Sequence, residues 1–278
     1  MAVSKNLEKL VRSLETKKGR KKEGLFVAEG PKVVGDLMAV STPVRLIATE
    51  AWFASTGITP REQDALVSED ELRKVSFLQH PQQVMGLFPQ FPPPMLEGIP
   101  TLEGICRSAL PLRSPKNPRH PSALILALDG VQDPGNLGTI IRIADWFGID
   151  TVYCSQDTAD VYNPKVVQAT MGSIARVHIT YIDLPEWLTS LPKDLPVYGT
   201  FLDGQNIYDQ ELSPHGIIVM GNEGNGISPE VAAHVNRRLL IPNYPPSRET
   251  ADSLNVAIAT AITCAEFRRR GCTLSIEY

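Results

Sequence analysis

The stretch IIVMGNEGNGISPE, residues 217–230, decides the fold class of this 278-residue chain. Its four leading apolar residues predict a strand that is buried on both faces, as in a mainly parallel sheet. A loop with three glycines follows, and Ser228 before Pro229 marks a helix start, because a capping side chain precedes a proline at the first helical position. Asn163 and Pro164 form a second such start. Similar apolar runs recur at 123–128, 151–154, 197–201 and 238–241. The C-terminal half is therefore predicted to be α/β with a mainly parallel sheet.

The N-terminal part shows weaker alternation of helices and strands. Residues 4–15 predict an amphipathic helix, residues 17–22 a lysine-rich turn, and residues 25–28 and 44–48 strands. From about residue 89 to 121 the pattern changes to a proline-rich composition that is typical of linkers. The sequence thus predicts a smaller α/β domain over residues 1–90, a linker over 91–121 and a second domain over 122–278.

Composition limits the class of protein. Hydrophobic residues make up 42% and charged residues 21%, as in globular proteins, and no apolar run is long enough to span a bilayer. The N-terminus has no secretory signal, so we expect a soluble, cytoplasmic protein. The four cysteines form no CxxC pair and the five histidines show no metal-ligand spacing, so we expect no disulfide and no metal.

Charge is unevenly distributed along the chain. The net charge is −4, but residues 1–32 hold nine basic and four acidic residues, which gives this segment +5 and leaves −9 for the remainder. One interpretation is a solvated helix followed by a flexible lysine-rich turn. The other is that the basic segment contacts nucleic acid.

Three segments of the C-terminal half could carry chemistry. The first, LDGVQDPGNLGTIIR (residues 128–142), runs from a strand end through a loop into a helix. If that helix begins near Asn136, Arg142 lies about two turns in, near the loop mouth; the alternative is an exposed helical arginine. The second is the glycine loop of residues 221–226, whose GxxGxG spacing late in the domain argues against a dinucleotide fingerprint.

The third segment joins LIPNY (residues 240–244) to SLNVAIATA (residues 253–261). A strand ends at a proline-rich loop, and Ser253 is a plausible cap for the helix that follows. That helix is apolar on nearly every face through Ala265, so it must be buried on more than one side. The pattern leaves open whether the monomer core or a dimer contact buries it.

In this order and at these separations, the three segments resemble the motifs of the SpoU branch of the SPOUT methyltransferase superfamily. The first is similar to the N-LG-R motif, the second to GNE-G, and the third to the IP loop followed by SLNV. FVAEGPK, residues 26–32, is also similar to the start of the substrate-binding domain that precedes many such enzymes. The resemblance covers most of the chain outside the linker, although it is weak between residue 32 and the linker.

The resemblance implies a trefoil-knotted C-terminal domain, a homodimer packed through the final helix, and transfer of a methyl group from S-adenosyl-L-methionine (AdoMet), without a metal, to a ribose 2'-hydroxyl of RNA. The N-terminal domain favours rRNA over tRNA as the substrate. Residues that match the family's catalytic or substrate-orienting positions are Arg142, Asn136, Glu223, Ser253 and Asn255. Residues that match its cofactor-binding positions are Thr200, Phe201, Leu202, Gly221, Gly224, Ile241 and Leu254. Basic residues expected to contact RNA are Lys17, Lys18, Lys21, Lys22 and Arg142.

These residue types suit the chemistry. A ribose hydroxyl is a poor nucleophile, so an enzyme must align it with the methyl group and assist removal of its proton. Arg142 could clamp a nearby phosphate or take part in that proton removal, and the high pKa of guanidinium favours the positioning role. Two alternatives remain: a catalytically silent RNA-binding protein that keeps the fold, and an enzyme that methylates an RNA base.

Overall fold

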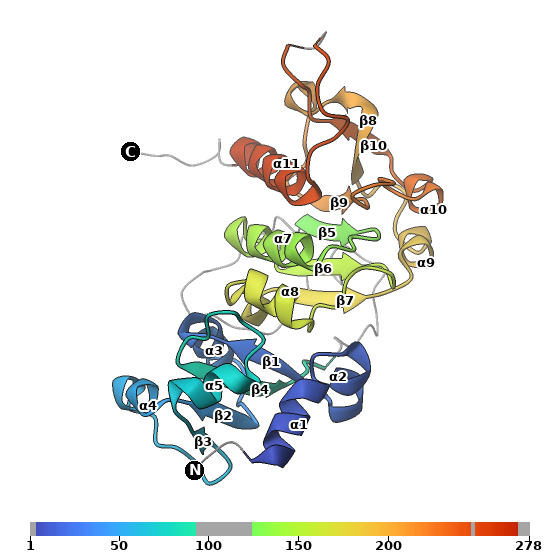
Figure 1. Cartoon of the computed structure of the whole chain (residues 1–278). Coiled ribbons are helices and arrows are strands. Elements are labelled where there is room, and N and C mark those ends of the chain that lie inside the picture. Colours follow the sequence, from blue (N-terminus) through green and yellow to red (C-terminus); the bar gives the residue numbers. More distant parts are fainter. Residues whose placement is uncertain (1–3, 93–123, 246–247, 272–278) are drawn as a thin grey trace. The chain divides into compact units, whose positions relative to one another are not determined.

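The computed structural model describes residues 4–92, 124–245 and 248–271 (Figure 1). The chain divides into two compact units, Met1–Pro92 with Asp160–Ala175, and Pro93–Ala159 with Arg176–Tyr278. Each unit has its own sheet. Most of the predicted linker lies outside the described residues.

The first unit is built on a four-stranded sheet of order β1-β4-β2-β3. Strand β4 is antiparallel to both of its neighbours, whereas β3 is parallel to β2. The strands are β1 (Leu25–Glu29), β2 (Arg45–Ala48), β3 (Ala65–Leu66) and β4 (Val84–Pro89). The helices are α1 (Lys5–Ser13), α2 (Lys17–Glu23), α3 (Pro31–Met38), α4 (Glu50–Thr56), α5 (Glu69–Val75), α8 (Pro164–Ala169) and the 3₁₀ turn η1 (Ser173–Ala175).

The prediction of a turn over residues 17–22 was wrong, because this segment forms helix α2. The Thr16 side chain accepts a hydrogen bond from the Gly19 amide at the N-terminus, and Gly24 ends the helix with a φ of 65°. Arg20 is buried in this unit and pairs with Asp160. Gly19 is the one residue of α2 with poor helix propensity, and the cap at Thr16 and the contact of Arg20 with Asp160 help to hold the helix.

The second unit holds a six-stranded sheet of order β10-β8-β9-β5-β6-β7, in which every neighbouring pair is parallel. The strands are β5 (Leu124–Leu128), β6 (Thr151–Cys154), β7 (His178–Tyr181), β8 (Val197–Asn206), β9 (Gly216–Met220) and β10 (Arg237–Leu240). The helices are α7 (Pro134–Trp146), α9 (Leu184–Thr189), α10 (Pro229–Ala232), α11 (Val256–Gly271) and the 3₁₀ turn η2 (Ile207–Asp209). The prediction of an α/β domain with a mainly parallel sheet is confirmed.

Helices cover both faces of this sheet (Figure 1). One face of the central strands, including Ile125 and Ile217, packs against the apolar residues of α9 and α10. Side chains alternate along a strand, so the intervening residues face the other side. Helices α7 and α11, which contact each other, lie on that side in Figure 1. The burial of both faces explains why the central strands are apolar throughout.

Strand order reverses between β5 and β9. From β5 the chain continues to β6 and β7 on one side, whereas β9, β8 and β10 lie on the other. In open parallel sheets, ligands bind outside the carboxyl ends of strands at such a reversal. The first two sequence segments follow β5 and β9 directly, so both emerge at this point. The trefoil knot stays a prediction.

Within the described ranges, none of the helices has the length and hydrophobicity needed to cross a membrane.

Candidate active site

The loops after β5 and β9 are tied to each other by buried and half-buried hydrogen bonds. Asp129 Oδ2 accepts from the Ser228 amide at 2.6 Å, and Asn222 Nδ2 donates to the Gly130 carbonyl at 2.7 Å. The amide of Gly130 in turn donates to Ser155 Oγ at 2.8 Å. The first two of these bonds connect loops more than 90 residues apart in sequence, so the two loops form one rigid platform at the sheet edge.

The glycine loop is also closed on itself. Asn222 and Gly226 exchange backbone hydrogen bonds of 2.8 and 3.0 Å. A Cβ on Gly221 would lie 2.2 Å from the carbonyl carbon of Gly226, so any larger residue would displace that backbone. Asn222 Oδ1 accepts from the Gly224 amide at 2.9 Å. The first glycine of the motif is therefore required by close approach of the backbone.

Three side chains, one from each sequence segment, form a hydrogen-bonded relay. Asn136 Nδ2 donates to Glu223 Oε1 at 2.9 Å, and Asn255 Nδ2 donates to Asn136 Oδ1 at 2.9 Å. Asn255 Oδ1 then accepts from the amides of Ala257 and Ile258 at 3.0 and 3.3 Å. Every amide group in the relay thus has its donor and acceptor ends fixed by a partner. We call this set, Glu223, Asn136 and Asn255, the relay.

Glu223 anchors the relay as a carboxylate. Its oxygens also accept from the backbone amides of Gln132 and Asp133 at 3.3 and 3.2 Å. Burial alone would raise the pKa of Glu223, but the hydrogen bond from Asn136 and the backbone hydrogen bonds outweigh it and lower this pKa. Glu223 is therefore ionised at neutral pH and orients its neighbours as an acceptor.

The prediction that Ser253 caps the last helix was wrong. Helix α11 begins at Val256, and Asn255 caps it through the two bonds to Ala257 and Ile258. Ser253 is exposed two residues earlier. The amide oxygen of Asn255 can reach the helix amides while its nitrogen contacts Asn136, which a serine hydroxyl at residue 253 does not do in this structure.

Arg142 lies outside the relay. It is exposed on α7, and its side chain makes no hydrogen bond or ion pair with any residue that the structure describes. Helix geometry places it about 9 Å along the axis from Asn136 and about a third of a turn around it. The structure thus brings together three of the five predicted catalytic residues and leaves Arg142 and Ser253 free.

A bulge interrupts β8 near the same edge of the sheet. Pairing with β9 ends at Gly199, and pairing with β10 skips from Gly199 to Gln205. The backbone of residues 200–204 is therefore left out of both ladders. Arg238 lies 3.5 Å from the centre of the Phe201 ring and pairs with Asp203 at 2.6 Å, which holds the bulge in place.

Comparison with known proteins identifies the family. The SpoU rRNA Methylase family matches residues 123–265, just over half of the chain, and the MRM3-like substrate binding domain matches residues 6–86. The chain belongs to the SpoU rRNA methylase family. The resemblance, the enzyme class of RNA methyltransferase and the small N-terminal domain ahead of the parallel sheet, all predicted from sequence, are confirmed.

Three relatives match this chain over nearly its whole length. The 23S rRNA (guanosine(2553)-2'-O)-methyltransferase RlmP of Bacillus subtilis is 31% identical over 92% of this chain and 94% of its own length. A TrmH-family structure from Porphyromonas gingivalis is 40% identical, covers 97% of this chain and 100% of its own, and has a TM-score of 0.79. The AdoMet-bound rRNA methyltransferase of Sinorhizobium meliloti is 29% identical, with coverages of 99% and 98% and a TM-score of 0.77.

The AdoMet-bound structure of the Sinorhizobium meliloti relative and the methyltransferase relatives confirm the predicted methyl donor. The chemistry of the residues at the sheet edge is compatible with this cofactor. The backbone of Thr200, Phe201 and Leu202, which lies outside the register of both ladders, could offer hydrogen-bonding groups for an adenine edge. The side chains of Leu202 and Leu254 are exposed apolar surface that a bound adenosine could cover. Gly221 is buried and Ile241 half-buried, while Gly224 is exposed. AdoMet supplies the electrophilic methyl group; the chain's own residues would bind and orient the reactants.

Three residues that hold the two loops of this site together were not predicted from the sequence to have a role. Asp129, Asn222 and Asp133 each make hydrogen bonds that position the two loops. Only Asp133 before Pro134 carried a readable signal, that of a helix cap. In the described parts of the chain, no group of three or more histidine, cysteine or acidic residues could hold a metal ion.

Proposed function

We propose that this protein transfers a methyl group from AdoMet to a ribose 2'-hydroxyl of structured RNA, with rRNA favoured over tRNA. The observation that carries the proposal is the relay, which joins all three motifs through side chains whose orientation is fixed. The name of RlmP, a 23S rRNA 2'-O-methyltransferase 31% identical to this chain, supports the choice of rRNA and of the ribose.

In this proposal the exposed groups act on RNA and the relay orients them. Arg142 would contact a backbone phosphate next to the target ribose, because its planar guanidinium has no partner among the described residues. Ser253 would hydrogen-bond the RNA or the loop. Asn136, Glu223 and Asn255 would hold the loops and the target in the aligned geometry that methyl transfer requires.

The proposed cofactor contacts are backbone groups and apolar side chains at the sheet edge. Main-chain atoms of the β8 bulge and of the loops after β9 and β10 would bind the adenosine and methionine parts, since ladder pairing leaves the β8 bulge open. The residues are Thr200, Phe201, Leu202, Gly221, Gly224, Ile241 and Leu254.

Helix α2 is the proposed site of RNA recruitment. Four lysines are exposed on this short helix, whereas Arg20 is buried and cannot reach RNA. Phosphate neutralisation requires clustered free cations, and the remainder of the chain is acidic. The lysine face of α2 consists of Lys17, Lys18, Lys21 and Lys22. We assign residues 1–90 to the RNA-binding domain, 91–121 to the linker and 122–278 to the catalytic domain.

A homodimer packed through the final helix is also part of the proposal. Trp146 on α7 is 85% exposed and Ile258 on α11 is 52% exposed, and these two helices contact each other. Large exposed apolar side chains on adjacent helices are typical of an interaction surface. Light scattering of the intact protein tests this: Trp146→Asp with Ile258→Asp should shift a dimer to a monomer. The bacterial relatives suit a cytoplasmic location.

The test of function is methyl transfer from labelled AdoMet to purified rRNA and tRNA, followed by nuclease digestion. We expect label on the ribose of an rRNA nucleotide. Label on a base would instead establish the base methyltransferase, and RNA binding without transfer would establish the silent RNA-binding protein. Mapping 2'-O-methyl groups in cellular RNA with and without the protein then finds the position, starting from guanosines of 23S rRNA.

A further inference from the structure

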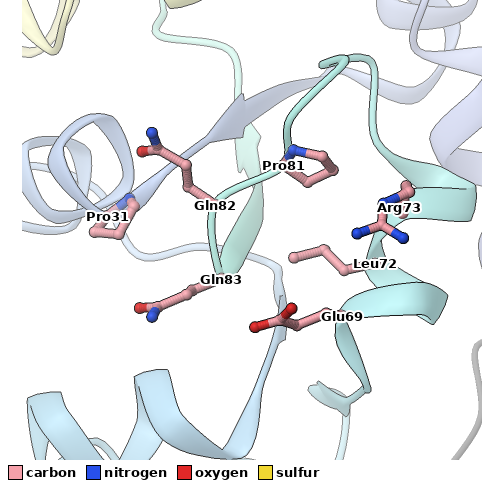
Figure 2. Close-up of a pocket in the computed structure, with 7 residues that line it drawn as sticks. All are labelled: Pro31, Glu69, Leu72, Arg73, Pro81, Gln82 and Gln83. Atoms are coloured by element: carbon pink, nitrogen blue, oxygen red, sulfur yellow. The ribbon is translucent and has the colours of Figure 1, made fainter.

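A pocket of about 430 Å³ lies in the first unit, and none of its lining residues belongs to the three sequence segments of the candidate active site (Figure 2). Three elements form it: the start of α3, one side of α5, and the segment that leads into β4. Its volume is within the range of small-ligand sites in proteins. Its lining residues are Pro31, Glu69, Leu72, Arg73, Pro81, Gln82 and Gln83.

Two neighbouring glutamines supply free amide groups to this pocket. The side chains of Gln82 and Gln83 are exposed and make no hydrogen bond with the residues described in the structure. Figure 2 shows both extending to the side on which Pro31 opens α3. A Cβ placed on Gly30, just before Pro31, would lie 3.5 Å from Gln82 Oε1, so this amide reaches the start of α3.

The backbone that carries the glutamines is held in an uncommon conformation. Gln83 has a φ of 52°, in the left-handed region that few residues other than glycine and asparagine adopt. The surrounding bonds fix it: the Thr49 amide donates to the Gln83 carbonyl and the Gly30 amide to the Val84 carbonyl, each at 2.9 Å. Strain of this kind persists where the surroundings enforce it, and it clusters at binding sites.

We propose that this pocket binds an unpaired RNA base and so contributes to target recognition. A glutamine amide can donate and accept at once, which matches the edge of a nucleobase. Pro31 and Pro81 offer apolar surface to the face of a base. Arg73 adds a guanidinium that can stack on it. Proteins read RNA sequence mainly from unstacked bases in loops and bulges, through such edge contacts and stacking.

An RNA base is favoured over other occupants by the chemistry and position of the pocket. The carboxylate of Glu69 disfavours a bare phosphate but can accept hydrogen bonds from a base. All seven lining residues lie within residues 6–86, which match a substrate-binding domain. This inference rests on the proposed function, since it gives that domain a means to read sequence beyond the charge of α2.

The test uses the full chain and a set of RNA hairpins with the same stem, whose loops are all adenosine, cytidine, guanosine or uridine, or carry abasic sites. The variant is Gln82→Leu with Gln83→Asn, because asparagine tolerates the left-handed backbone while its amide is shorter. Gln79→Leu is the matched control, as an exposed glutamine from the same stretch that does not line the pocket. AdoMet affinity and melting temperature report folding.

We expect the unaltered protein to prefer some loops over others and over the abasic loop. The double variant should lose about tenfold in affinity for the preferred loop and bind all loops alike, with AdoMet affinity and the salt dependence of RNA binding unchanged. Gln79→Leu should behave as the unaltered protein. The proposal is overturned if the unaltered protein binds every loop equally, or if the double variant keeps its preference.

This result is separate from the test of function. A double variant that keeps its loop preference while methyl transfer to rRNA proceeds would remove the pocket proposal alone. Absence of methyl transfer by the unaltered protein, with loop discrimination intact, would remove the proposed function and leave the base pocket in place.

Discussion

Removing one partner from the buried pair of Arg20 and Asp160 should strongly destabilise the first unit. Arg20 is 2% exposed, and its guanidinium donates to Asp160 Oδ2 at 2.6 and 3.1 Å. It also donates to the carbonyls of Leu14 and Glu15 at 2.9 and 2.8 Å. The side chain of Asp160 is 16% exposed. Asp160→Asn therefore leaves a desolvated cation without a counter-charge.

Breaking such a pair by removing one partner costs about 3–5 kcal/mol, because the remaining charge is buried and uncompensated. We take the lower end, about 3 kcal/mol, because the amide oxygen of the substituted asparagine could still accept one hydrogen bond and the two carbonyls remain. With a urea m-value of about 1–3 kcal/mol per molar, the unfolding midpoint should fall by roughly 1–3 M. Added salt should change this loss little, since buried charges are weakly screened.

The matched control is Asp70→Asn, which breaks the pair between Asp70 and Arg73 in the same unit. Those side chains are 81% and 62% exposed, so the change should cost less than about 1 kcal/mol. Urea unfolding gives both values, and hydrogen exchange of the α2 amides shows whether the loss is local to that helix. If the two variants are destabilised equally, the assigned burial of Arg20 is wrong.

Four further outcomes are expected. Arg142→Ala should lower methyl transfer by on the order of a hundredfold with AdoMet affinity unchanged, and Arg142→Lys should also be poor; a parallel loss of AdoMet affinity would contradict the assigned role. Neutralising the lysine face of α2 should reduce the slope of log RNA affinity against log salt concentration for all RNAs. An unchanged slope would show that the lysine face is only a solvated surface. Calorimetric AdoMet binding should be the same with and without a chelator. Arg269 and Arg270 lower the pKa of Glu266 to about 2. The stability that ionised Glu266 contributes is therefore fully present above its unfolded pKa of about 4.3 and is lost as the pH falls toward 2. Glu266→Gln should remove this loss of unfolding free energy between about pH 4 and pH 2, which unfolding measured against pH would show.

The sheet of the second unit was largely predictable because its central strands are buried on both faces. Strand β5 is buried at all five positions, so its sequence is apolar throughout and readable. Strand β7, at the sheet edge, was not among the predicted strands. Its sequence HITY contains the strand formers Ile, Thr and Tyr, but it is only four residues long and is fully buried only at Thr180, so it lacks the continuous apolar run of the central strands.

Helix α2 shows where local sequence misleads. Its KKGRKKE sequence contains a central glycine, which favours a turn, and six charged residues, which show no apolar face of the kind that identifies a helix in a sequence. The partner that stabilises it, Asp160, lies 140 residues away. No local pattern could supply that contact. The glutamines of the pocket were missed for a related reason: exposed polar residues in a loop are common, and a positive φ at Gln83 cannot be read from its residue type.

The site was predictable as three motifs but not as a geometry. Resemblance named Asn136, Glu223 and Asn255, yet their mutual hydrogen bonds depend on the adjacency of β5 and β9 and on the start of α11. The expected cap at Ser253 was wrong because Asn255 serves both the helix and the relay.

The residues of the candidate site fall into two groups, those whose side chains are hydrogen-bonded within the protein and those whose side chains are exposed. Side chains that would only orient others, such as Glu223 and Asn136, have their polar groups engaged within the protein. Arg142 and Ser253, which would meet the RNA, are exposed and have no side-chain partner in the described chain. A long, unpaired arginine keeps its rotamer freedom until a ligand fixes it, at a cost of up to about 2 kcal/mol. The relay can therefore be rigid before RNA arrives, whereas Arg142 and Ser253, in the roles proposed for them, would become ordered only on the substrate. Under that proposal, methyl transfer would depend on correct docking of the RNA.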